Sequence, residues 1–182
     1  MRIRMVCAIV LSLLCFSSGQ VCNTATTLRP GRFSIGIAPV IYTHYNNDLD
    51  LYLNAGVGIA RDMDLSIKLI LNDYSTYFGG DFEFVILSDF PTISLAAGMH
   101  SSYNLGVDAT FNLSLPIRKI LSLYGGLDGD IEFYDHGTGF PLWGFLGLQV
   151  MVRRHLGLFM EIDVGIHDFA PDMLDIGINV FF

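Results

Sequence analysis

The sequence predicts an all-β protein, a transmembrane up-and-down antiparallel β-barrel of about ten strands, with eight strands as the alternative. Three observations indicate this fold. Apolar residues recur at every second position from residue 31 onward, short turns alternate with longer loops, and the positions between the apolar ones are rich in acids and glycine. The chain divides into a signal peptide over residues 1–19, a short lead over 20–30 and the barrel over 31–182.

The first residues have the composition of a cleavable secretory signal peptide. Arg2 and Arg4 form a basic start, residues 5–16 are apolar, and small residues follow over 17–19. This apolar stretch is too short to span a bilayer as a helix, which favours cleavage over anchoring. Cysteines stand at positions 7, 15 and 22, so only Cys22 would remain, and a disulfide framework within the chain is excluded.

The remaining chain is apolar in composition but has no long apolar run. Hydrophobic residues make up 52% and charged residues 15% of the sequence, against about 25% charged residues in typical soluble domains. No window after residue 20 offers the ~18 consecutive apolar residues that a transmembrane helix needs. Loss of Arg2 and Arg4 with the signal peptide leaves 8 basic and 18 acidic residues, a net charge of −10, which argues against a nucleic-acid partner.

Ten strands are expected, each bounded here by its first and last apolar residue. They cover 33–41, 49–59, 65–71, 78–86, 93–99, 105–115, 121–133, 142–152, 156–166 and 174–182. Short turns are expected at 61–64, 88–91, 116–119 and 153–155, and longer loops at the opposite end, as in a meander. Pro39 would remove a hydrogen-bond donor from the first strand, so we expect a bulge there or a short first strand.

The residues between the apolar positions indicate which face contacts lipid. They comprise eleven glycines and ten acids with a single strand lysine, Lys68. A water-facing outer surface would mix charges and carry few strand glycines, whereas a narrow lumen has room only for small residues between large polar ones. The apolar face is therefore expected to contact lipid. Besides Asp50, the expected lumen acids are Asp81, Glu83, Asp108, Asp128, Asp130, Glu132, Glu161, Asp163 and Asp175.

Aromatic residues gather near the strand ends, where interfacial girdles of a membrane barrel are expected. They include Tyr42, Tyr77, Phe78, Phe133, Tyr134, Phe140, Trp143 and Phe182.

With its signal peptide, period-two strands and final aromatic residue, the chain resembles small outer-membrane β-barrel proteins of Gram-negative-type bacteria over residues 31–182. The resemblance implies location in the outer membrane, contact with its lipid, and recognition of the last strand by the barrel-insertion machinery. The residues of that expected assembly signal are Leu174, Ile176, Ile178, Val180 and Phe182. No motif identifies a subfamily or an oligomeric state.

Four histidines fall at the end of the meander with the longer loops: His44, His100, His136 and His167. Beside Asp135 and Asp168, such a rim could bind a divalent transition metal or supply an acid and a base. Because histidine is also a common polar loop residue, no catalytic residue, metal site or cofactor is predicted.

Two enzyme families offer weaker resemblances. The pairs Asp135-His136 and His167-Asp168 are similar to the rim groups of omptin proteases, but no Asp-x-Asp lies at this rim, since Asp128-Gly129-Asp130 lies deeper. His100-Ser101-Ser102 is similar to the His-x-Ser of outer-membrane lipid A deacylases, but the alternation places His100 on the lumen side.

The preferred function is therefore a non-enzymatic envelope or surface role for a barrel filled by its own side chains. Three alternatives stay open: a narrow cation-favouring pore lined by the lumen acids, a rim-site enzyme acting on lipid or peptide, and a secreted soluble barrel of lipocalin type with the apolar face inside.

Overall fold

A computed structural model describes residues 24–43, 49–71, 76–102, 104–118, 120–168 and 170–182. Eleven strands follow one another: β1 (Phe33–Tyr42), β2 (Leu49–Ala60), β3 (Met63–Leu71), β4 (Thr76–Leu87), β5 (Thr92–Ser101), β6 (Leu105–Arg118), β7 (Leu121–Tyr134), β8 (Gly137–Gly139), β9 (Leu142–Arg153), β10 (Leu156–His167) and β11 (Met173–Phe181). No helix in the described ranges is long and apolar enough to cross a membrane.

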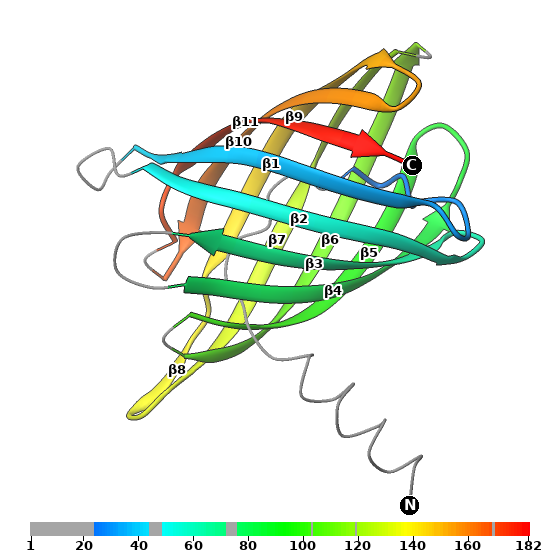
Figure 1. The fold of residues 1–182 in the computed structure, drawn as a ribbon. Helices are drawn as coiled ribbons and strands as arrows, with labels where there is room; N and C mark the ends of the chain where they lie inside the picture. The colour runs from blue at the N-terminus through cyan, green and yellow to red at the C-terminus, as the bar shows by residue number, and fades with distance from the viewer. Residues whose placement is uncertain (1–23, 44–48, 72–75, 103, 119, 169) are drawn as a thin grey trace, which may run out of the picture.

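The strands close into one antiparallel barrel (Figure 1). β1 to β7 pair in sequence order, β7 pairs with β9, and β11 pairs with both β10 and β1. β8 is a three-residue strand that folds back on the end of β7, so ten strands form the wall. Closure satisfies the backbone hydrogen-bonding groups between strands, which the interior of a bilayer requires. The predicted fold class and the count of ten are confirmed.

The predicted strand ranges agree with the structure to within a few residues, with four differences. β3 begins at Met63, inside the turn expected at 61–64. β6 continues through Pro116 to Arg118, where a turn was expected, and β8 was not anticipated. The expected bulge or short strand at Pro39 is wrong, because β1 is ten residues long and keeps one register with β2 across this position. Pro39 faces outward, and between Ser34 and Tyr42 the ladder to β11 lacks pairs at Ala38 and Pro39 while its register stays the same on both sides.

Side-chain exposure follows the predicted alternation. Along β10, Ile162 and Val164 are 47% and 51% exposed, whereas Glu161 and Asp163, which alternate with them, are buried. The exposed apolar side chains form a belt around the wall that includes Ile35, Leu51, Ile67, Phe111, Leu127, Leu146 and Ile176. An apolar exterior of this extent is a surface for lipid. The chain is thus a transmembrane barrel, and the alternative of a soluble barrel with the apolar face inside is wrong.

Two of the expected girdle aromatics, Trp143 and Tyr77, are buried inside the barrel instead, and Tyr42 packs against the same internal cluster. Trp143 and Tyr77 are each 5% exposed and belong to an internal cluster with Tyr52 and Phe159. The Trp143 indole donates to the Pro171 carbonyl over 3.0 Å. The other described girdle candidates with more than a third of their surface exposed are Phe133, Tyr134, Phe140 and Phe182.

The described part of the lead enters the barrel at the end with the short turns, called here the short-turn end. The Ala25 N–H donates to Ser114 Oγ and the Leu28 N–H to Asp64 Oδ2, each over 2.8 Å. Ala25 is fully buried. The lead therefore occupies lumen space at this end, and Asp64, expected in a turn, becomes a lumen residue that holds it.

We predict that Leu127→Arg destabilises the barrel by about 2–4 kcal/mol, because Leu127 faces lipid in the middle of β7 and a charge at the bilayer midplane is costly. The matched control is Leu121→Arg at the first residue of the same strand, where the cost falls to about 0–1 kcal/mol. Urea unfolding in lipid vesicles measures both. Equal losses in the two variants would contradict the assigned lipid face.

We also predict that Asp64→Asn loosens the lead, because an amide oxygen accepts the Leu28 N–H less strongly than a carboxylate does. Hydrogen exchange over residues 24–32 should accelerate by about tenfold or more, in line with a loss of about 1.5 kcal/mol in a charge-assisted bond. Asp62→Asn, in the exposed turn beside it, should leave this exchange unchanged. Unaltered exchange in Asp64→Asn would show that this bond does not hold the lead.

Candidate functional site in the lumen

Strand register brings the polar lumen residues of β3 to β7 into two neighbouring rows. The first, called here the aspartate row, pairs one residue from each strand across the sheet: Ser66, Asp81, Gly98, Asp108 and Asp130. The second, the histidine row, lies two residues nearer the long-loop end: Lys68, Gly79, His100, Gly106 and Glu132. Large polar side chains thus sit beside glycines in both rows.

Two of these glycines make the room that the polar groups occupy. A methyl group at Gly106 would overlap the His100 ring, and one at Gly98 would overlap carboxylate oxygens of Asp81 and Asp108. The His100 ring therefore lies across Gly106 and reaches toward the aspartate row. These glycines are required by the close approach of side chains from adjacent strands.

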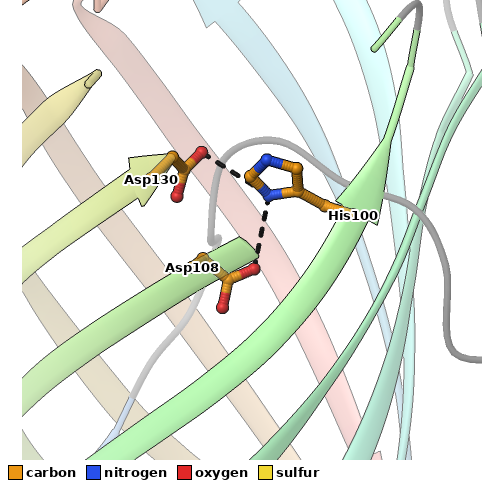
Figure 2. Close-up of side chains that lie close together, drawn as sticks. All are labelled: His100, Asp108 and Asp130. Atoms are coloured by element: carbon orange, nitrogen blue, oxygen red, sulfur yellow. Dashed lines mark ion pairs between the residues drawn. The ribbon is translucent and has the colours of Figure 1, made fainter. Parts of the chain in front are cut away.

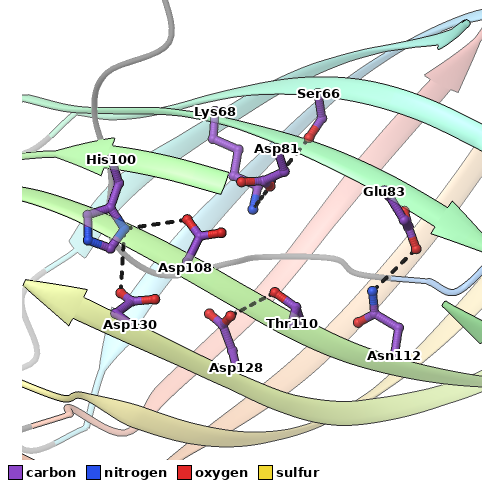
Figure 3. Close-up of polar contacts among 10 residues, drawn as sticks. All are labelled: Ser66, Lys68, Asp81, Glu83, His100, Asp108, Thr110, Asn112, Asp128 and Asp130. Atoms are coloured by element: carbon purple, nitrogen blue, oxygen red, sulfur yellow. Dashed lines mark hydrogen bonds and ion pairs between the residues drawn. The ribbon is translucent and has the colours of Figure 1, made fainter. Parts of the chain in front are cut away.

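A buried ion pair links the two rows (Figure 3). Lys68 Nζ contacts Asp81 Oδ2, and both side chains are only 4% exposed. The Ser66 hydroxyl also donates to this carboxylate, over 3.4 Å. A buried cation that faces a carboxylate compensates part of the desolvation cost of both groups.

Hydrogen bonds extend the network toward the short-turn end (Figure 3). The Thr110 hydroxyl donates to Asp128 Oδ1 over 2.7 Å. Glu83 accepts from the Ser94 hydroxyl and, over 3.3 Å, from the Asn112 amide. Five strands thus contribute to one polar lumen network.

His100 lies between two carboxylates (Figure 2). Its Nδ1 is 3.4 Å from Asp108 Oδ2 and 3.7 Å from Asp130 Oδ2. The imidazole is 2% exposed, and neither contact reaches ordinary hydrogen-bond length.

A second acidic group lies on the other side of the lumen. Glu161 and Asp163 of β10 and Asp175 of β11 are fully or almost fully buried, and one ligand atom from each falls within 4.8 Å of the others. Glu161 pairs in register with Asp175.

The structure places all ten expected lumen acids, Asp50 included, on the inward face of the wall. Glu83, Asp108 and Glu132 are partly buried, and the other seven are buried. Glu132 lies nearest the long-loop end, where it accepts a hydrogen bond from the Tyr134 hydroxyl.

The histidines do not gather at one rim site. His100 is buried with the lumen acids, whereas His136 and His167 are exposed, and His44 lies outside the described residues. His167 Nδ1 is 3.2 Å from Asp168 Oδ1 and equally far from the Phe140 carbonyl. The expected rim cluster is thus not formed by the described histidines, and among them only His100 contacts the lumen acids.

The expected assembly residues lie on the outward face of β11 and just beyond it. Ile176, Ile178 and Phe182 are exposed, while Leu174 and Val180 are partly exposed. Their recognition by the insertion machinery stays a prediction.

No family model matches the sequence, and no curated protein matches it. Solved structures show a likeness of shape. A de novo designed transmembrane β-barrel is 16% identical, with 86% of this chain and 100% of that chain covered and a TM-score of 0.47. The N-terminal β-barrel domain of Pseudomonas aeruginosa OprF is 13% identical, with 85% and 100% covered and a TM-score of 0.42. The Yersinia pestis outer membrane protein Ail is 14% identical, with 84% and 99% covered and a TM-score of 0.45.

These likenesses assign no activity to the chain. Its own closed ten-strand wall and apolar exterior make it a small β-barrel of the outer-membrane class.

We predict that Lys68→Met destabilises the barrel by about 3–5 kcal/mol, because it leaves Asp81 buried without its cation. The double variant Lys68→Met/Asp81→Leu should recover most of this loss, since replacing both partners of a buried pair by apolar groups is often close to neutral. Urea unfolding of the refolded proteins measures both. A double variant no more stable than the single one would mean that Lys68 acts mainly on the other acids.

Proposed function

We propose that the protein is a non-enzymatic outer-membrane barrel with an envelope or surface role, closed to solute passage by its own interior. The observation that carries this proposal is the double filling of the lumen, by the polar network of β3 to β7 and by the described lead at the short-turn end. The long-loop end and the outer surface of the wall are then the parts available to partners.

Two spaces remain between the lead and the wall, and neither has a lining residue at the long-loop end among the described residues. A polar cavity of about 90 Å³ lies between the lead and lumen residues such as Asn54, Lys68 and Asn179. A larger space of about 760 Å³ opens at the short-turn end between the lead and residues of β7, β9 and β11. Between these spaces and the long-loop end stand the Lys68–Asp81 pair and the buried His100.

The lumen acids and Lys68 together argue against the alternative of a cation-favouring pore. Acids dominate the lumen, which would attract cations, but Lys68 places a positive charge among them. A hydrated cation would also have to displace the ion pair and the hydrogen-bonded side chains around it.

The contacts of His100 argue against the alternative of a rim-site enzyme. Its described polar contacts are with Asp108 and Asp130 and not with Ser102, and it is enclosed by the wall. Asp128 and Asp130 are likewise buried in the lumen. Lipid or peptide hydrolysis that disappears in a His100→Ala/His136→Ala/His167→Ala variant would contradict a non-enzymatic role.

We predict that the refolded mature protein gives background conductance in planar bilayers at every voltage, because the Lys68–Asp81 pair, its hydrogen-bonded neighbours and the lead lie across the lumen. A porin refolded in the same way is the positive control for insertion, and heat-modifiable gel migration verifies folding of the sample. Steady, cation-selective current steps from the folded protein would overturn the closed-barrel proposal in favour of the pore.

A further inference from the structure

Three potential metal ligands converge near the long-loop end of the lumen (Figure 2). His100, Asp108 and Asp130 come from the adjacent strands β5, β6 and β7, and one ligand atom from each lies within 4.8 Å of the others. Register fixes this arrangement, because Asp108 and Asp130 are paired directly and His100 lies one row nearer the mouth. All three side chains are at least nine-tenths buried.

The separations suit a shared cation better than direct hydrogen bonds. Nδ1 of His100 lies 3.4 Å and 3.7 Å from the two carboxylate oxygens, beyond the usual N–H···O range. Ligand atoms that bind a tetrahedral zinc ion at about 2.0–2.2 Å stand about 3.3–3.6 Å from one another. The two separations from Nδ1 thus lie within a few tenths of an ångström of that spacing, and all three ligand atoms lie within 4.8 Å of one another.

Most of the buried ligand atoms also lack hydrogen-bond partners in the described part of the chain. This applies to both ring nitrogens of His100 and to both carboxylate oxygens of Asp130, whereas in Asp108 it applies to Oδ1 and not to the Oδ2 that faces His100. Buried polar atoms without such partners are costly. A cation bound through Nδ1 and one oxygen from each aspartate would satisfy three ligand groups at once.

The charge around the three residues favours a divalent ion. Asp81, Asp108, Asp128 and Asp130 place four carboxylates here, and Lys68 interacts with Asp81, Asp108 and Asp128. With Asp81 paired to Lys68, an ionised cluster with a neutral imidazole retains an excess of negative charge. A divalent cation would offset most of it, and a neutral imidazole is the form that binds metal.

We propose that His100, Asp108 and Asp130 bind a divalent transition-metal cation of the zinc type at the long-loop end of the lumen. The mixed nitrogen and oxygen donor set favours such an ion over magnesium or calcium, which prefer oxygen ligands. His100 is the second-last residue of β5, so the ion would enter from the long-loop side. The site does not depend on whether the barrel conducts ions.

Metal-free refolded protein in nanodiscs should be titrated with Zn²⁺ by calorimetry, with Mg²⁺ as the comparison ion. We expect one saturable zinc equivalent and at least tenfold weaker binding in both His100→Gln and Asp130→Asn. The matched controls are His155→Gln, which changes an exposed histidine at the short-turn end, and Asp175→Asn, which changes the second acidic group. Both should bind zinc as the wild type does.

A wild-type measurement keeps the test decisive if either ligand variant misfolds. In NMR spectra of the ring nitrogens, zinc should shift the His100 signal and leave the His155 signal in place. Absence of saturable zinc binding, unchanged affinity in folded His100→Gln and Asp130→Asn, or an unmoved His100 signal at zinc saturation would each overturn the site. Loss of binding only in Asp175→Asn would place the ion in the other acidic group and likewise overturn it.

Discussion

The pairing of β1 with β11 is the constraint on which the rest of this structure depends. In lipid, every unpaired backbone N–H and C=O costs several kcal/mol, so a spanning sheet must close on itself. The two strands pair from Ser34 opposite Phe181 to Tyr42 opposite Met173. Once this seam fixes the register, alternate residues of every strand are committed to lipid or lumen, and ten strands set how wide the lumen can be.

A lumen of that width explains why large side chains and glycines alternate across strands. His100 lies over Gly106, Tyr124 over Gly147 and Phe159 over Gly177, and a methyl group at any of these glycines would overlap the side chain above it. The same narrowness forces the acids together. Lys68, hydroxyl and amide donors, and the amide of Leu28 then become the groups that hold the acids in place.

The wall was predictable from the sequence because period-two alternation is a local signal. The lumen contacts were not predictable, since they depend on the register between strands. Alternation placed His100 inward, but its contact with Asp130 needed the offsets across β5, β6 and β7. Trp143 was assigned to a girdle from its type and its place near a strand end, although the alternation of its strand already pointed it inward. The lead carries no periodic pattern, and its bonds to Asp64 and Ser114 span 36 and 89 residues.

The most direct test of this account is which methyl groups contact lipid. NMR in nanodiscs with methyl-labelled protein can detect magnetisation transfer between side-chain methyls and lipid acyl chains. Ile162 and Val164 on the exterior of β10 should show strong transfer, and the fully buried Val40 of β1 should show none. Transfer to Val40, or its absence at both Ile162 and Val164, would contradict a barrel with a lipid-facing apolar exterior and a filled interior.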